Sequence, residues 1–255
     1  MTQDHAGRHG HFGSGRANGD LAQARAVLFD KDGTLFAFER GEGEIGQRLI
    51  HELSHGDRGL SRALAETAGY DAVEGKYAPD SLIASGSWAL LAKRWAQDLP
   101  LWRADELEAW LRLEAVSLSR LARAPAAADL KTLLRRLCRA GLRLGLATHD
   151  VEASARRQLE RAHIAELFPF VAGYGSGFAP KPDPAMLQGF CASVGVEAGD
   201  VVVVGDSVAD LAMARAGGAL AGIGVLSGPA DADILAPEAD LILPSIADLP
   251  AALGV

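Results

Sequence analysis

The sequence predicts a doubly wound α/β fold, in which helices cover both faces of a parallel sheet and a helical domain is inserted after the first strand. From Arg25 onward, short apolar runs alternate with amphipathic helical segments, which is typical of strand–helix–strand units. Between Phe38 and Arg123 this alternation stops, and helix-like stretches follow one another. We therefore expect a disordered tail over 1–22, a core formed by 23–37 and 124–255, and a helical insertion over 38–123.

Short apolar runs mark the strands of the core. The four consecutive valines of Val201–Val204 are typical of a central parallel strand that is buried on both faces. Ala26–Phe29 is the first strand, and it is followed directly by acidic residues. The other expected strands are Leu142–Ala147, Phe168–Ala172, Ala221–Val225 and Leu241–Leu243, and the expected helices are Leu130–Ala140, Val151–His163, Pro184–Val194 and Leu211–Ala216.

The insertion contains all four tryptophans of the chain. The seven-residue spacing of Trp88 and Trp95 places this pair on one face of a helix. We interpret the tryptophans as the filling of a small separate core, with an aromatic substrate-binding surface as the alternative. The helices expected in the insertion are Ile45–Leu53, Leu60–Ala68, Asp80–Gln97 and Ala104–Leu121.

Composition narrows the possible partners. With 25 basic and 33 acidic residues, the formal net charge is -8, whereas a nucleic-acid-binding surface needs clustered positive charge. The N-terminal segment lacks the apolar stretch of a secretory signal, and no later apolar run is long enough to cross a membrane. We expect a cytoplasmic protein without nucleic-acid or membrane partners. The sequence carries no signal for its oligomeric state.

Charged and hydroxyl side chains follow the expected strands at the edge where open α/β sheets bind ligands. They are Asp30 and Asp32 after the first strand, Thr148 after Leu142–Ala147, Lys181 in the loop FAPKPDP, and Asp206 and Asp210 after the valines. Up to four carboxylates in one cleft need a divalent cation, and oxygen-only ligands indicate Mg²⁺. A lysine and a hydroxyl beside them can contact the anionic oxygens of a substrate. Together these groups predict a phosphoryl-transfer site.

Four segments of the chain resemble the four motifs of the haloacid dehalogenase superfamily. They are DKDGT, LGLATHD, APKPDP and VVVVGDSVADLAMARAGG, and they occur in that family's order. The resemblance extends from Ala26 to the C-terminus and is greatest to the phosphoglycolate phosphatase-type branch, whose helical C1-type cap follows the first motif. It implies a Rossmann-like core and a Mg²⁺-dependent phosphatase. The implied substrate is a small phosphate monoester, phosphoglycolate-like or a sugar phosphate.

The resemblance also assigns roles to individual residues. Asp30 resembles the nucleophile that forms an aspartyl-phosphate. Asp32 resembles the general acid that protonates the leaving alcohol and then the base that activates water. Mg²⁺ would be held by Asp30, the main-chain carbonyl of Asp32, and Asp206, with Asp210 beside it. Thr148, His149 and Lys181 would bind the phosphoryl oxygens.

Two residues depart from the pattern of that branch. Lys31 stands where leucine, valine or isoleucine is usual, so its charge is expected either near the cleft or in solvent. His149 stands where asparagine is common, and a solvent-facing loop histidine is the alternative to phosphate contact. Neither departure replaces a catalytic residue.

Three other functions can be compared with a phosphatase. A nucleotide-binding P-loop is excluded, because Pro182 follows Lys181 where serine or threonine is required. A phosphoacceptor receiver domain has neither the long insertion nor a second aspartate two residues after the acceptor. A sugar phosphomutase of the same branch, which returns the phosphoryl group to its substrate, is the alternative within the enzymes.

Overall fold

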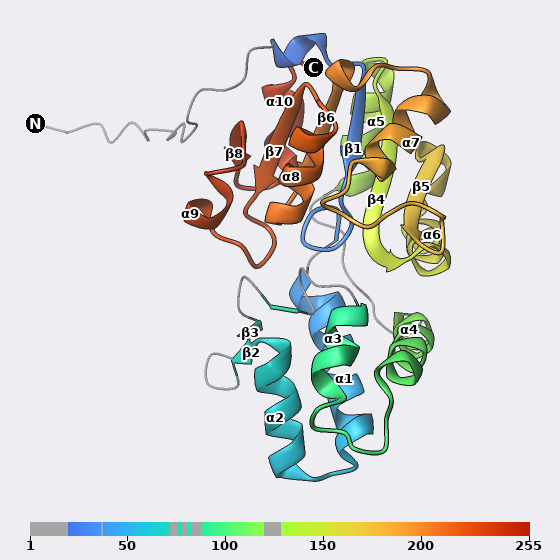
Figure 1. The fold of residues 1–255 in the computed structure, drawn as a ribbon. Helices are drawn as coiled ribbons and strands as arrows, with labels where there is room; N and C mark the ends of the chain where they lie inside the picture. The colour runs from blue at the N-terminus through green and yellow to red at the C-terminus, as the bar shows by residue number, and fades with distance from the viewer. Residues whose placement is uncertain (1–19, 37, 72–75, 78–80, 83–87, 120–128) are drawn as a thin grey trace, which may run out of the picture.

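The protein, described here from a computed structural model, is built on a six-stranded parallel sheet with the strand order β5-β4-β1-β6-β7-β8 (Figure 1). The structure describes residues 20–36, 38–71, 76–77, 81–82, 88–119 and 129–255. The strands are β1 (Ala26–Phe29), β4 (Arg143–Val151), β5 (Phe170–Tyr174), β6 (Val201–Gly205), β7 (Ala221–Val225) and β8 (Leu241–Leu243). Because the strand order changes direction at β1, the carboxyl ends of β1, β4 and β6 border the crevice in which such sheets bind ligands.

Alternate residues of β1 belong to two hydrophobic layers, one on each face of the sheet. Val27 and Phe29 pack in the layer with α5 (Leu130–Arg139), α6 (Glu152–Arg161) and α10 (Leu249–Ala252). Ala26 and Leu28 pack in the layer with α7 (Ala185–Val194) and α8 (Val208–Ala216). All five residues of β6 are buried, as its run of valines predicts. The expected doubly wound fold is confirmed.

Several element boundaries differ from the sequence-based prediction. β4 continues past Ala147 to Val151, because pairing with β5 resumes at Val151 and Tyr174 although the apolar run has ended. α8 begins at Val208, three residues earlier than expected, because the Ser207 side chain caps its first turn. Short elements without a periodic pattern were not predicted: η1 (Leu21–Gln23), η2 (Ala165–Leu167), η3 (Ala198–Asp200), α9 (Ala232–Leu235) and η4 (Ile246–Asp248).

The start of the described chain corrects one expectation. Asp20 accepts a hydrogen bond from the Ala22 N–H at 3.1 Å and caps η1, so part of the stretch expected to be disordered forms a 3-10 turn. The rest of that stretch, 1–19, lies outside the described residues.

The insertion contains α1 (Phe38–Ser54), α2 (Arg58–Ala68), α3 (Trp88–Trp95) and α4 (Ala104–Ser119). It also contains a hairpin of two-residue strands, β2 (Tyr70–Asp71) and β3 (Lys76–Tyr77), which the sequence reading missed because such short strands have no periodicity. The helix expected from Asp80 is described only as α3, since 78–80 and 83–87 lie outside the described residues.

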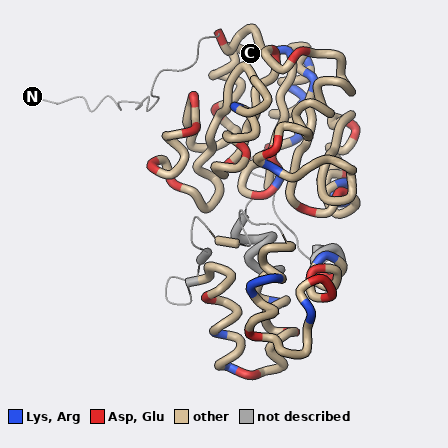
Figure 2. The backbone as a smooth tube through the Cα atoms, viewed as in Figure 1, with Lys and Arg blue, Asp and Glu red and all other residues tan. Residues whose placement is uncertain are grey.

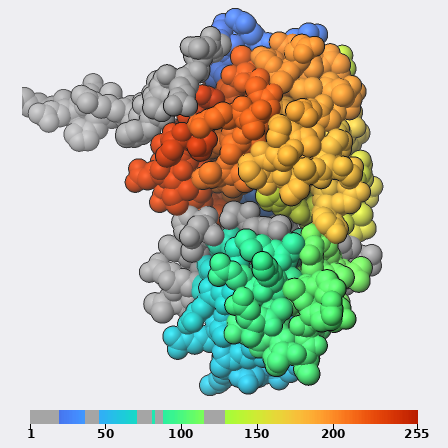
Figure 3. All heavy atoms as spheres, in the orientation of Figure 1, coloured from blue at the N-terminus to red at the C-terminus, as the bar shows by residue number. Residues whose placement is uncertain are grey.

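Tryptophan fills the core of this insertion, as predicted. Trp95 is fully buried, and its indole N–H donates to the Leu64 carbonyl at 2.9 Å. Trp102 and Trp110 pack against the same cluster, with ring centroids 5.6 Å apart. We call the insertion the cap, because it lies opposite the carboxyl ends of the core strands (Figure 1). Figure 3 shows its helices as a separate body below the core.

A cation–π contact joins the cap to the core. The guanidinium of Arg112, on α4, lies 3.1 Å from the ring centroid of Tyr174 at the end of β5. Glu108 accepts hydrogen bonds from the same guanidinium at 3.0 and 2.6 Å. None of the described helices has the length and apolar character needed to cross a membrane.

Candidate active site

The loop after β1 is held in place by main-chain hydrogen bonds. The Asp30 N–H donates to the Val204 carbonyl of β6 at 2.8 Å, and the Gly33 N–H donates to the Phe36 carbonyl at 2.7 Å. Gly33 has a φ of +81°, a conformation that costs glycine little. Asp30 is thereby placed at the centre of the crevice, and it is only 8% exposed.

Lys181 joins three segments that are distant in sequence. Its Nζ donates to Asp30 Oδ1 at 2.6 Å, to Asp210 Oδ1 at 2.6 Å and to the Ala147 carbonyl at 3.2 Å. The two contacts with carboxylates are short, as charge-assisted hydrogen bonds are. The lysine therefore links the end of β1 and the middle of β4 with the first turn of α8. Figure 2 shows acidic and basic residues close together at the cap-facing end of the core.

Asp210 is held by the start of its own helix. Its Oδ2 accepts hydrogen bonds from the Ser207 N–H at 3.1 Å and the Ser207 hydroxyl at 2.6 Å, and the Asp210 N–H donates to Ser207 Oγ at 3.4 Å, which completes a capping box. Both of its oxygens therefore already have protein donors. The serine was missed at the sequence level, although its spacing of three residues from Asp210 is the signal that could have identified it.

Asp206 lies in a narrow pocket formed by two glycines. A Cβ on Gly33 would lie 2.3 Å from Asp206 Oδ2, and one on Gly228 would lie 1.8 Å from the same atom, so neither position accepts a side chain. The Thr34 hydroxyl donates to Asp206 Oδ1 at 3.4 Å, and the Ser227 hydroxyl donates to the Gly33 carbonyl at 2.7 Å. No local pattern in the sequence indicates that the loop after β7 approaches Asp206.

The cluster carries more negative charge than the described side chains compensate. Burial, with additional repulsion from Asp210, raises the pKa of Asp30 to about 7 even though Lys181 opposes the rise. Burial and repulsion from Asp30 raise the pKa of Asp206 well above its ordinary value. Burial alone would lower the pKa of Lys181, but Asp210 and Asp30 raise it above its ordinary value, so the lysine is charged.

Three of the carboxylates lie close enough together to hold a metal ion. Asp30, Asp206 and Asp210 each offer one oxygen, and these atoms lie within 4.8 Å of one another. The donors are all oxygens, which suits Mg²⁺, and a cation would relieve the repulsion that raises the pKa values of Asp30 and Asp206. Since Asp210 already accepts from Lys181 and Ser207, the residues fit a metal held mainly by Asp30 and Asp206.

Thr148 and His149 lie on the last residues of β4. The Thr148 hydroxyl accepts the Asp150 N–H at 3.1 Å, which leaves its own proton for another acceptor. His149 Nε2 lies 3.0 Å from the Lys181 carbonyl oxygen. Burial, together with the nearby Lys181 ammonium, lowers the pKa of His149 to about 4, so its ring is neutral at physiological pH. Contact between His149 and a phosphate stays a prediction.

Asp32 lies beside Lys31 at the edge of the same crevice. The Lys31 Nζ is 2.5 Å from Asp32 Oδ2, and the Asp32 side chain is 11% exposed. Despite the short distance, Asp32 Oδ2 has no hydrogen-bond donor with suitable geometry among the described residues. The contact is therefore an ion pair without an aligned hydrogen bond.

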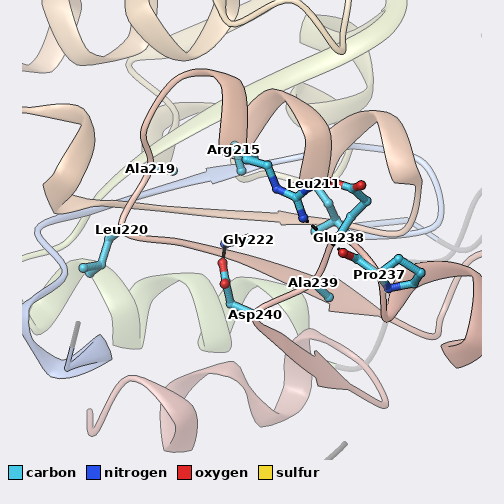
Figure 4. Close-up of a pocket in the computed structure, with 10 residues that line it drawn as sticks. Leu211, Arg215, Ala219, Leu220, Gly222, Pro237, Glu238, Ala239 and Asp240 are labelled. Carbon is cyan, nitrogen blue, oxygen red and sulfur yellow. Dashed lines mark hydrogen bonds and ion pairs between the residues drawn. The ribbon is translucent and has the colours of Figure 1, made fainter. Parts of the chain in front are cut away.

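A separate hollow of about 210 Å³ lies between α8, the start of β7 and the segment before β8 (Figure 4). Its polar groups are already paired. Arg215 contacts Glu238 at 2.8 Å and the Pro237 carbonyl at 3.1 Å, and Asp240 accepts the Gly222 N–H at 2.8 Å. This hollow is lined by none of the predicted site residues.

The fold and the site together define an enzyme of the α/β class, and comparisons with known proteins specify the family. The sequence matches the haloacid dehalogenase-like hydrolase family over residues 24–218. It is 34% identical to a phosphoglycolate phosphatase of Rhodospirillum rubrum in an alignment of 208 residues that covers 76% of each chain. The chain therefore belongs to the haloacid dehalogenase-like hydrolases, and it is a phosphatase.

Solved structures share the whole fold at low sequence identity. A predicted phosphoglycolate phosphatase from Haemophilus somnus superposes with a TM-score of 0.67 at 20% identity, covering 90% of this chain and 97% of its own. A β-phosphoglucomutase from Clostridium difficile superposes with a TM-score of 0.63 at 16% identity, covering 91% and 97%. At these identities the likeness concerns the fold of core and cap.

The raised pKa of Asp30 gives a testable pH dependence of stability. Because the folded protein holds this proton more tightly than the unfolded chain, folding takes up a proton between about pH 4 and pH 7. We expect the free energy of unfolding of the metal-free protein, relative to that of Asp30→Asn, to fall as the pH rises through this range. Denaturant unfolding in excess chelator measures it. A difference in the free energy of unfolding that is constant or rises with pH would contradict a raised pKa for Asp30.

Proposed function

We propose that the protein is a Mg²⁺-dependent phosphatase that hydrolyses a small phosphate monoester, phosphoglycolate or a sugar phosphate, through an aspartyl-phosphate on Asp30. The observation that carries this proposal is the buried contact of Lys181 with Asp30 and Asp210. This contact places the Lys181 ammonium beside the Asp30 carboxylate. Asp206 and Asp210 lie next to Asp30, and the oxygens of these carboxylates suit a metal. The similarity to a phosphoglycolate phosphatase supports the substrate class.

In the first half of the reaction, an Asp30 carboxylate oxygen attacks phosphorus and the bond from phosphorus to the ester oxygen breaks. Asp32 gives its proton to the leaving alkoxide. Lys181, after exchanging one of its three present hydrogen bonds, donates to a phosphoryl oxygen together with the Thr148 hydroxyl. We assign neutral His149 to the same group of contacts. Mg²⁺, held by Asp30, Asp206 and the Asp32 carbonyl, would neutralise charge on the phosphoryl group.

In the second half, Asp32 is ionised and accepts a proton from water as that water attacks the phosphorus of the aspartyl-phosphate. The bond between phosphorus and the Asp30 oxygen breaks, inorganic phosphate leaves, and both carboxyl groups return to their initial states. Asp210 contacts Lys181 and Ser207 instead of the substrate, so its role in this scheme is to fix the lysine.

A sugar phosphomutase is the second candidate, favoured by the shared fold of a β-phosphoglucomutase. A mutase would return the phosphoryl group to a sugar phosphate instead of to water. Measuring free phosphate and isomerised sugar phosphate in the same reaction separates the two candidates. A receiver-like phosphoacceptor would show no turnover of para-nitrophenyl phosphate.

Metal dependence tests the proposed chemistry. The purified protein is assayed with 2-phosphoglycolate, several sugar phosphates and para-nitrophenyl phosphate, in Mg²⁺, in Ca²⁺ and in excess chelator. We expect phosphate release with Mg²⁺ and inhibition by Ca²⁺, because Ca²⁺ accepts more and longer bonds and would let Asp30 bind through both oxygens, away from the line of attack. Full activity in excess chelator would contradict the proposal.

A further inference from the structure

Lys31 is a buried lysine to which the proposed mechanism gives no role. It lies between Asp30 and Asp32 in the sequence and is 3% exposed. Its Nζ is 2.5 Å from Asp32 Oδ2, 3.3 Å from Asp150 Oδ2, and donates to Gln158 Oε1 at 2.8 Å. The lysine therefore connects the loop after β1 with the end of β4 and with α6.

The charges of this group argue against a second anion-binding site. A buried ammonium is costly unless opposite charges and hydrogen bonds compensate it. Among its described partners, Lys31 meets the two carboxylates of Asp32 and Asp150 and the neutral amide of Gln158. Two carboxylates thus face one ammonium. This cluster therefore has no spare positive charge with which to bind a second anionic group of a substrate.

We propose that Lys31 is a positioning residue for Asp32, an inference that rests on the proposed function of Asp32 as proton carrier. Asp150 and Gln158 fix the ammonium from two elements of the rigid core, and the ammonium fixes the Asp32 carboxylate by charge. Because Asp32 Oδ2 has no aligned donor among the described residues, it stays available to give or accept a proton. A leucine, valine or isoleucine at this position could not supply such a contact.

The proposal predicts a selective loss of activity. Displacing a catalytic group by about 1 Å costs on the order of 10²-fold in rate. In Lys31→Met we expect single-turnover phosphoryl transfer from an alkyl phosphate to fall about 10- to 100-fold. Transfer from para-nitrophenyl phosphate should fall much less, because nitrophenolate leaves without a proton. Equal losses on both esters would overturn the assignment, since they would indicate a general disturbance of the site.

A double-mutant comparison tests whether Lys31 acts through Asp32. In an Asp32→Asn background, Lys31→Met should cause little further loss on the alkyl ester, because the group it positions is already inactive. A full additional loss there would overturn the proposal. Arg25→Met is the control, since it removes a cation paired with Asp200 at the opposite end of β1 and should leave the ratio of alkyl to aryl rates unchanged.

A second variant keeps the test decisive if Lys31→Met does not fold. Gln158→Leu removes one anchor of Lys31 but leaves both charges of the Lys31–Asp32 pair. It should shift the alkyl-to-aryl ratio in the same direction by a smaller factor, and an unchanged ratio would count against the proposal.

Absence of phosphate release by the wild-type protein would contradict the proposed function itself, together with this role. Wild-type turnover with an unchanged ratio in the variants would contradict the role of Lys31 alone.

Discussion

Replacing Asp30 by asparagine should abolish turnover of every phosphate ester. The substitution removes the proposed nucleophile and one metal ligand together, so neither phosphoenzyme nor phosphate release above background is expected. The variant should remain folded, because asparagine has nearly the same shape and Lys181 keeps its contacts with Asp210 and the Ala147 carbonyl. At pH above about 7 it also lacks the buried charge that the wild-type Asp30 carries.

Acid-quench trapping of phosphoenzyme, with thermal unfolding as a check of the fold, measures this outcome. Asp200→Asn is the matched control, because Asp200 pairs with Arg25 at the amino end of the sheet. It should keep wild-type turnover. Turnover by Asp30→Asn at a rate close to that of the control would mean that another group attacks phosphorus.

Replacing Asp32 by asparagine should have a large effect that depends on the leaving group. The variant keeps Asp30 and the main-chain carbonyl of residue 32 but loses the proton carrier, a function typically worth about 10²–10⁴-fold. An alcohol leaves poorly without protonation, whereas nitrophenolate leaves as the anion. Phosphoryl transfer should therefore fall far more for an alkyl phosphate than for para-nitrophenyl phosphate.

This comparison requires single-turnover conditions. Hydrolysis of the aspartyl-phosphate also needs Asp32, so steady-state rates would fall for both esters whichever group leaves. With the aryl ester, the variant should release one equivalent of nitrophenol and then accumulate phosphoenzyme. Equal losses for the two esters in the first step would mean that Asp32 has another role.

Local patterns were sufficient to predict the framework of the fold. A strand buried on both faces must be apolar at every position, so Val201–Val204 could be assigned to the sheet centre without any tertiary information. The spacing of Trp88 and Trp95 likewise predicted a separate helical core, and both tryptophans pack in it. Elements whose stability depends on partners distant in sequence were missed or shortened, as with the two-residue strands of the cap and the last residues of β4.

The sequence by itself determined which groups are available for chemistry, because the side chains after the strands of a parallel sheet must meet at one edge. Only the tertiary structure decided which of these charged groups contact one another. Lys181 contacts both Asp30 and Asp210, Gly228 leaves room for Asp206, and Lys31 turns inward to Asp32 instead of outward to water. The physical reason is that burial and distance set these interactions. Both depend on segments brought together by folding, and no local pattern in the sequence encodes them.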